Sequence, residues 1–278
     1  MHLFCFSYGY VAKFLSKKLL NLGWKVSGTS KNQDIPNVNL SNYEKVNQDL
    51  LKSATHVLIS IPTDGDDVLE RYGDCLQNIK WLGYLSATSV YGDHAGNWVT
   101  EESKTKPVES RGENRLRSEK KWLNSKLPVH IFRLAGIYGP GRNVLVDLQL
   151  NKARNVQKEG HFFSRIHVED ISNILFSSIQ NIKPGEIYNC ADDLPATQSE
   201  VVVYAAKLLN VSAPKPIEVS SLSDYAQSFY LGLKKVSNAK IKKDLNVSLI
   251  YPNYKVGLES LYIKKTESRC NKIDKPII

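Results

Sequence analysis

Strand-length apolar runs alternate with helix-length amphipathic stretches through the first 190 residues, and this alternation limits the folds open to the chain. The runs that predict buried strands are HLFCFSY (2–8), WKVSGTS (24–30), THVLISIP (55–62), WLGYLSATS (81–89), LPVHIFRLAGIYG (127–139) and GEIYNCA (185–191). The stretches that predict helices are 10–23, 41–54, 66–79, 110–126, 167–181 and 197–211. This order predicts an α/β protein with a doubly wound parallel sheet and helices on both faces. Such a sheet binds its ligand at the carboxyl ends of the strands, where the strand order reverses.

The last hundred residues are organised differently. After about residue 180 the chain shows short helical stretches and proline-rich joints, APKP (213–216) and IYPNY (250–254). We therefore expect two units, residues 1–180 forming the sheet domain and residues 181–278 forming a smaller C-terminal domain. A strand near 186–191 is expected to complete the sheet of the first unit.

Composition excludes several classes of protein. The 278 residues are 42% hydrophobic, as in globular proteins, and no run of eighteen apolar residues predicts a membrane span. The first residues lack the basic start of a signal peptide. The four cysteines are scattered without C-x-x-C spacing, which predicts reduced thiols, no zinc site and a cytoplasmic location.

The net charge of +9 bears on the partners of the chain. The excess is diffuse, and no aromatic interleaving or nucleic-acid-binding motif accompanies the lysines, so nucleic acid is not an expected partner. A positive field favours an anionic small ligand such as a nucleotide.

The turn after the first predicted strand is similar to a phosphate-binding loop. It reads Ser7-Tyr8-Gly9-Tyr10-Val11-Ala12, where dinucleotide-binding loops read G-x-G-x-x-G. Gly9 is the glycine that lets backbone approach a pyrophosphate, and the following helix would present its N–H groups there. Ser7 replaces the turn glycine and fits if its backbone avoids positive φ. The alternative is an ordinary strand–helix turn.

The end of the second predicted strand bears on which dinucleotide binds. NAD-binding folds place an acidic residue there to hold the ribose 2′-hydroxyl. This chain has Thr29, Ser30 and Lys31 instead. Two hydroxyls and a cation suit a 2′-phosphate, so the sequence favours NADP over NAD. An exposed polar turn is the alternative.

Three further stretches carry a resemblance to a known family: LSATSVYGDH (85–94), LPVHIFRLAGIYGPGRN (127–143) and SRIHVEDI (164–171). Together with the loop, they resemble the extended short-chain dehydrogenase/reductase superfamily, the NAD-dependent epimerase/dehydratase family, and look closest to an atypical branch of it. The resemblance implies a Rossmann domain with a smaller C-terminal substrate lobe. Two-fold dimers are common in that superfamily, so a homodimer is a candidate assembly.

The catalytic triad of that family is replaced in this chain. The family uses a Ser or Thr hydroxyl, a Tyr that exchanges a proton, and a Lys four residues after the Tyr. Matched by position, these places hold Ala87, Arg111 and Arg115. An arginine cannot release a proton near neutral pH, whereas Arg115 can still hold ribose or phosphate oxygens. Thr88 and Ser89 follow the lost hydroxyl. Side chains alternate along a strand, so Ser89 would share the direction of Ala87, but Thr88 stands where dehydratases of the family carry an Asp and is the candidate in that turn.

These observations assign candidate residues to three roles. The catalytic candidates are Thr88, Arg111 and Arg115. Candidates for cofactor binding are Tyr8, Gly9, Tyr10, Val11, Thr29, Ser30, Lys31, Ile61, Pro62, Ser86 and Arg115. Arg142, Arg165 and His167 are candidates for substrate binding, and with Arg111 and Arg115 the arginines predict a cationic pocket for an anionic substrate.

Two functions fit the pattern. The first is an NAD(P)-dependent epimerase, dehydratase or reductase with a nonstandard site for a small, anionic or sugar-nucleotide-like substrate. The second is a catalytically inactive NADP-binding redox sensor or regulatory protein, which the three substitutions favour.

Overall fold

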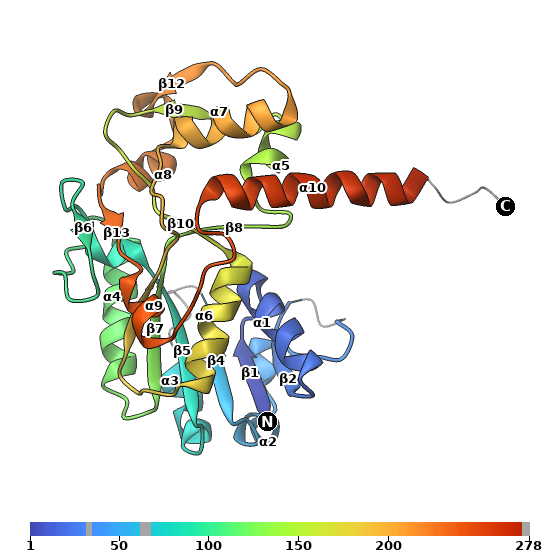
Figure 1. Ribbon diagram of the computed structural model, residues 1–278. Helices are drawn as coiled ribbons and strands as arrows, with labels where there is room; N and C mark the ends of the chain where they lie inside the picture. Colours follow the sequence, from blue (N-terminus) through green and yellow to red (C-terminus); the bar gives the residue numbers. More distant parts are fainter. Residues whose placement is uncertain (32–34, 62–67, 274–278) are drawn as a thin grey trace.

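A seven-stranded parallel sheet forms the centre of the computed structural model, which describes residues 1–31, 35–61 and 68–273 (Figure 1). The strand order is β11-β7-β5-β4-β1-β2-β3, and every pairing is parallel. The strands are β1 (His2–Phe6), β2 (Lys25–Thr29), β3 (Asn39–Ser41), β4 (His56–Ile59), β5 (Trp81–Ala87), β7 (Val129–Leu134) and β11 (Ile187–Cys190). The chain builds outward from β1 to β3 and then returns to the other side of β1. The predicted doubly wound sheet is therefore confirmed, with its switch point between β1 and β4.

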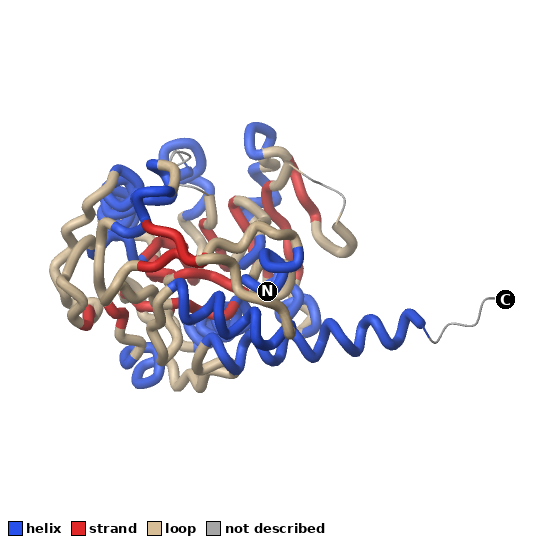
Figure 2. Tube along the Cα trace, turned by 90° about the horizontal axis from the view of Figure 1, so that it is seen from above, coloured by secondary structure: helices blue, strands red, loops and turns tan. Residues whose placement is uncertain are grey.

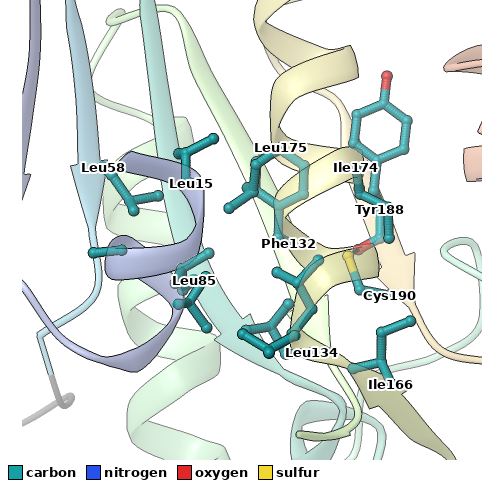
Figure 3. Packing of buried hydrophobic residues seen from close by; sticks show 14 of the residues in the cluster. Leu15, Leu58, Leu85, Phe132, Leu134, Ile166, Ile174, Leu175, Tyr188 and Cys190 are labelled. Atoms are coloured by element: carbon teal, nitrogen blue, oxygen red, sulfur yellow. Dashed lines mark hydrogen bonds between the residues drawn. The ribbon is translucent and has the colours of Figure 1, made fainter. Parts of the chain in front are cut away.

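Helices cover both faces of the sheet because successive side chains in each strand point to opposite sides. In β1, Leu3 and Cys5 belong to the core under α1 (Tyr10–Asn21) and α6 (Val168–Gln180). Phe4 and Phe6 belong to the opposite core, under α2 (Gln48–Lys52), α3 (Val68–Tyr72) and α4 (Ser110–Leu123). Figure 3 shows Leu15 of α1 and side chains of α6 packed against the sheet. Burial on both faces explains why the strands read as continuous apolar runs.

Two predicted helices are wrong in extent. The segment 41–54 divides into the end of edge strand β3, a 3-10 turn (Tyr43–Lys45) and α2, because Asn42 and Asn47 each accept a backbone N–H and start a new turn. The predicted helix 66–79 is interrupted at Gly73, where α3 gives way to a 3-10 turn (Gly73–Leu76). The predicted strand 127–139 also divides, into β7 and a short β8 (Gly136–Tyr138) that pairs with β10 (Arg165–His167).

A second lobe lies above the sheet in Figure 1. One part of it packs α5 (Val144–Gln149), α7 (Gln198–Leu209) and the start of α10 (Tyr254–Ile273) around a shared apolar cluster. Another pairs β9 (Asn155–Gln157) with β12 (Pro216–Glu218) beside the short helices α8 (Asp224–Gln227) and η6 (Ser228–Tyr230). The lobe thus includes α5 and β9, which precede residue 180. Helix α10 extends beyond the rest of the molecule (Figure 2).

Four further short elements belong to the fold. The 3-10 helix η4 (Thr88–Tyr91) follows β5 directly, and β6 (Trp98–Val99) pairs with β13 (Lys235–Val236), which is followed by α9 (Ala239–Asp244). Within the described part of the chain, no helix combines the length and apolar character that crossing a bilayer requires.

Candidate functional site

A cavity of about 840 Å³ opens between the sheet domain and the lobe, at the carboxyl ends of the strands. The loop after β1, the turn after β5 and helix α4 line it from the sheet domain. Residues 162–165 and the segment 225–236 line it from the lobe. Of the predicted site residues, those that line this cavity are Gly9, Tyr10, Val11, Ser86, Thr88, Arg111, Arg115, Arg142 and Arg165. The structure therefore brings nine of the predicted residues to one place.

The loop after β1 turns through Ser7, whose φ is +67°. The condition that Ser7 avoids positive φ is therefore not met, because this serine takes the left-handed conformation that glycine holds in the standard loop. The bonds around it fix the turn: its N–H donates to Thr29 Oγ1 at 2.9 Å, and its carbonyl accepts the hydroxyl of Ser60 at 2.6 Å. Tyr8, the next residue, points into the core rather than the cavity.

Gly9 and the start of α1 leave the loop open toward the cavity. Gly9 is the N-cap residue of α1. Glycine has no side chain that could accept a hydrogen bond from the first N–H groups of the helix. A Cβ built on Gly9 would meet nothing closer than Ser7 Oγ at 3.8 Å. Tyr10 opens α1 and donates its hydroxyl to Pro140 O at 3.0 Å, which ties the loop to the 139–141 turn.

The residues predicted to bind a ribose 2′-phosphate lie at the end of β2, but they differ in how far they are exposed to a ligand. Thr29 is buried and its hydroxyl is bonded to Ser7, so it holds the loop in place. Ser30 is half-buried and Lys31 is exposed. Ile61 follows β4 and is half-buried, and Pro62 lies outside the described residues.

Ser86 belongs to a buried polar network under the cavity. Its hydroxyl donates to Glu119 Oε1 at 2.5 Å, and Glu119 Oε2 lies 2.7 Å from Arg133 Nη2. Arg133 also donates to the Tyr91 hydroxyl, which in turn donates to Asn189. Burial opposes the charge on Arg133, but the bonds to Glu119 outweigh it and raise the pKa of Arg133.

The turn where the family triad would lie begins at Ala87, the last residue of β5. Thr88 starts η4, so the alternation of side chains along the strand has already ended there. Helix α4 packs closely on this turn because Gly112 has no side chain: a Cβ there would lie 2.9 Å from Ser89 O. Arg115, one turn after Arg111, donates to Leu85 O at 2.7 Å.

Arg111 connects the sheet domain with the lobe. Its guanidinium donates to Glu109 Oε2 at 2.5 Å and to Ser228 Oγ at 2.9 Å. The rings of Phe229 and Tyr225 lie 4.1 and 4.7 Å from the guanidinium carbon. Burial opposes the charge on Arg111, but the bonds to Glu109 outweigh it and raise the pKa of Arg111, so the side chain remains a cation.

The substrate candidates lie at two depths. Arg142 follows the 139–141 turn and its guanidinium lies 5.8 Å from the Tyr10 ring centroid. Arg165 donates to the carbonyls of Phe163 and Ala196, each at 2.9 Å, and burial lowers its pKa. His167 is buried and does not line the cavity: its Nδ1 accepts the N–H of Glu169 and caps α6.

Sequence reasoning missed the residues that the segment 225–234 contributes to this site, among them Tyr225, Phe229 and Lys234. Tyr225 and Phe229 are exposed aromatic residues at the cavity wall, and no spacing in the sequence links them to Arg111. Lys234 lines the cavity and donates to Gly92 O at 3.1 Å. In the sequence, Lys234 belongs to the basic stretch KKVS (234–237). Composition alone does not distinguish such a stretch from an ordinary solvent-exposed surface.

Three of the known proteins that are similar to the chain bear on its family and its fold. A conserved protein of unknown function from Silicibacter pomeroyi DSS is 40% identical, with a TM-score of 0.87 over 95% of this chain and 99% of that one. Protein YeeZ of Escherichia coli K12 is 29% identical over 237 residues, which cover 74% of this chain and 83% of YeeZ. No protein-family model matches the chain.

The third comparison concerns the fold. The UDP-glucuronic acid 4-epimerase of Bacillus cereus, solved in complex with NAD, has a TM-score of 0.78 at 16% identity, over 96% of this chain and 99% of that one. This likeness shows that the chain has the fold of that epimerase, and this is the fold that the resemblance of the sequence motifs implied.

Proposed function

We propose a function from the premise that this chain belongs to the same family as the Silicibacter pomeroyi protein and has the fold of the NAD-dependent epimerases. The chain binds a nicotinamide dinucleotide and acts as an epimerase, dehydratase or reductase on a small, anionic or sugar-nucleotide-like substrate. One observation carries this proposal: an open helix N-terminus and four arginines line the same cavity.

The loop after β1 fits a dinucleotide pyrophosphate. Gly9 leaves space beside the first turn of α1, whose N–H groups and partial positive charge favour an anion. Gly9, Tyr10 and Val11 would hold the pyrophosphate, and Arg115 would reach ribose or phosphate oxygens from α4. A bound nicotinamide supplies hydride transfer, and the chain contributes binding and orientation.

We propose NADP as the preferred dinucleotide. Ser30 and the exposed ammonium of Lys31 lie at the end of β2, where the ribose 2′ position is held in this fold. Thr29 supports the loop through its bond to Ser7. A carboxylate at this place would repel a 2′-phosphate, whereas Lys31 attracts it.

The arginines point to an anionic substrate. Arg142 and Arg165 line the wall formed by the 139–141 turn and β10, and Arg111 lies across the cavity on α4. A guanidinium matches carboxylate and phosphate oxygens in a two-pronged geometry. Arg111 acts in this site as a fixed cation, and Thr88 supplies a hydroxyl at the end of β5 for a substrate oxygen.

Fluorescence titration with NADPH and NADH tests the proposal. We expect NADPH to bind, Gly9→Val to weaken it because the valine side chain fills the space beside α1, and Lys31→Glu to weaken NADPH at least about tenfold, or 1.4 kcal/mol. Lys25→Glu, an exposed lysine at the opposite end of β2, is the matched control. Failure of both dinucleotides to bind would refute the proposal, and tighter binding of NADH would refute the preference for NADP.

The second candidate is a redox sensor that binds NADP without catalysis. Arg111 favours it, because this residue takes the place of the family Tyr and is already bonded to Glu109 and Ser228. NADPH that binds but is not oxidised across a panel of sugar nucleotides, aldehydes and quinones would favour this reading.

A further inference from the structure

Lys234 reaches from the lobe to the turn where the family triad would lie. Its Nζ donates to Gly92 O at 3.1 Å, and Gly92 closes the turn that begins at Ala87 and Thr88. Thr88 and Lys234 line the same cavity. The ammonium group therefore lies at the turn that follows β5, in the cavity that the dinucleotide loop also lines.

The backbone around Lys234 is fixed on both sides. Before it, the carbonyl of Leu233 accepts the N–H groups of His94 and Gly96, at 2.9 and 3.1 Å. After it, β13 pairs with β6, and the N–H of Lys235 donates to Asn97 O at 3.0 Å. Backbone hydrogen bonds thus hold the chain directly before and directly after Lys234, which suits a group that must meet a substrate atom.

The other titratable side chains in the described cavity lining are engaged elsewhere. Tyr10 donates to Pro140 O, and burial raises its pKa to about 12. The Tyr138 hydroxyl donates to Asn253 O, and burial raises its pKa further. Glu109 is paired with Arg111, and the arginines stay charged.

Tyr225 is the remaining phenol of that lining. It is 68% exposed, and its ring lies against the Arg111 guanidinium at the mouth of the cavity. A phenol has one O–H to donate, whereas an ammonium has three N–H groups, of which Lys234 uses one for Gly92 O. Lys234 is consequently the group inside the cavity that still has a proton to donate to a substrate.

We propose that Lys234 is the proton donor of this site and binds the carbonyl oxygen of an anionic carbonyl substrate. This inference rests on the proposed function. As the carbonyl becomes a hydroxyl, the C=O π bond breaks, its oxygen takes a proton from Nζ, and its carbon takes the hydride that a reduced nicotinamide supplies. The neutral amine then regains a proton from solvent. The arginines hold the anionic part of the substrate, so the carbonyl is directed toward Lys234.

The surroundings of Lys234 favour proton release. Burial lowers its pKa, while Glu109 and Asp93 partly oppose that shift. The titratable groups that face the ammonium are Asp93, Glu109 and His161; burial lowers the pKa of His161 to about 4, which keeps it neutral. Lysines with lowered pKa serve as acids and bases in enzymes for this reason.

Pyridoxal 5′-phosphate tests this inference without a known substrate, because it carries an aldehyde and a phosphate. Its imine with a lysine is fixed by borohydride, and peptide mapping locates the label. We expect Lys234 to be labelled first at substoichiometric reagent, inorganic phosphate to slow that labelling, and the pH midpoint of labelling to be lower at Lys234 than at Lys235. Lys235 is the matched control, since it is adjacent and its ammonium lies over the Phe162 ring instead.

The outcomes separate this inference from the proposed function. Equal labelling of Lys234 and Lys235, an equal pH midpoint, or labelling that phosphate does not slow would overturn the role of Lys234. Lys234→Gln should abolish the fast label while leaving NADPH fluorescence titration unchanged, and Lys235→Gln should change neither. NADPH binding without fast labelling would overturn the inference alone. Failure of both NADPH and NADH to bind would overturn the proposed function, and with it the reductive step at Lys234, even if Lys234 were labelled fast.

Discussion

Helix α4 takes part in two arginine–glutamate pairs. The two pairs have the same chemistry but differ in burial and in the residues around them. Glu119, in the second half of the helix, lies 2.7 Å from Arg133 of β7, and the two side chains are 2% and 4% exposed. Glu109 precedes the helix and lies 2.5 Å from Arg111, with 16% and 34% exposed. The first pair lies beneath the cavity, and the second lies at its wall.

Further hydrogen bonds hold the buried pair in place. Ser86 and Tyr91 extend it into a network that spans β5, η4 and β7. A charge without its partner is costly in such a place, because water cannot replace the lost bond. The network thus holds the end of β5 in one position, beneath Ala87 and Thr88.

The pair at the cavity wall has exposed neighbours. Arg111 contacts Ser228, Tyr225 and Phe229 from the lobe, and both aromatic residues are more than 45% exposed. Solvent can replace these contacts at modest cost. Helix α4 therefore has a fixed half under the cavity and a more exposed end at the cavity wall.

Glu119→Gln is expected to have the largest effect on the fixed half. It keeps the shape of the side chain but leaves the Arg133 charge without its partner, so the free energy of unfolding should fall by about 3–5 kcal/mol. Urea denaturation measures the change, with Glu113→Gln on the exposed side of the same helix as control. A loss below about 1 kcal/mol would place this pair in the same class as surface pairs.

Gly112→Ala tests the close contact between α4 and η4. A Cβ there would lie 2.8 Å from Pro107 Cβ and 2.9 Å from Ser89 O, so the helix must shift from η4. We expect a loss of about 2 kcal/mol, after the better helix propensity of alanine is included. Arg117→Ala, which changes an exposed position of α4, should stay within about 0.5 kcal/mol. A stabilised Gly112→Ala variant would show that the contact is loose.

Much of this architecture could be predicted from the sequence. The apolar runs at His2–Phe6 and Trp81–Ala87 gave the buried strands, because both faces of the sheet are covered. The break at 41–54 was not predicted, because two asparagine caps outweighed a weak helical pattern. Edge strand β3 is three residues long and carries little periodic signal.

The site could be predicted only in part. Motif position identified Gly9, Arg111 and Arg115, which come from the sheet domain. It gave no partner for Arg111, since Tyr225, Ser228 and Phe229 lie more than a hundred residues away and meet it only in the folded chain. The positive φ of Ser7 was also invisible, because the sequence does not show which bonds fix a turn.

Ser86→Ala tests how much the Ser86 hydroxyl contributes to the buried network around Glu119. The hydroxyl donates one bond to the Glu119 carboxylate, which keeps its bonds to Arg133, so the expected loss is about 1.5 kcal/mol and smaller than for Glu119→Gln. A double-mutant cycle of the two substitutions, read by urea denaturation, should show coupling, since the residues share one network. Additive losses would mean that Ser86 and Glu119 act independently.

Arg111→Ala should have the smallest effect on stability. The pair with Glu109 is partly exposed, so we expect a loss below about 1 kcal/mol. The variant also removes the guanidinium that Tyr225 and Phe229 contact, so the segment 224–230 should become easier to cleave in limited proteolysis. Phe229→Ala is the matched variant, because it removes the same contact from the lobe side and should raise cleavage similarly. If Arg111→Ala lowered the free energy of unfolding as much as Glu119→Gln, α4 would be fixed along its whole length. The proposed difference between the buried pair and the pair at the cavity wall would then be wrong.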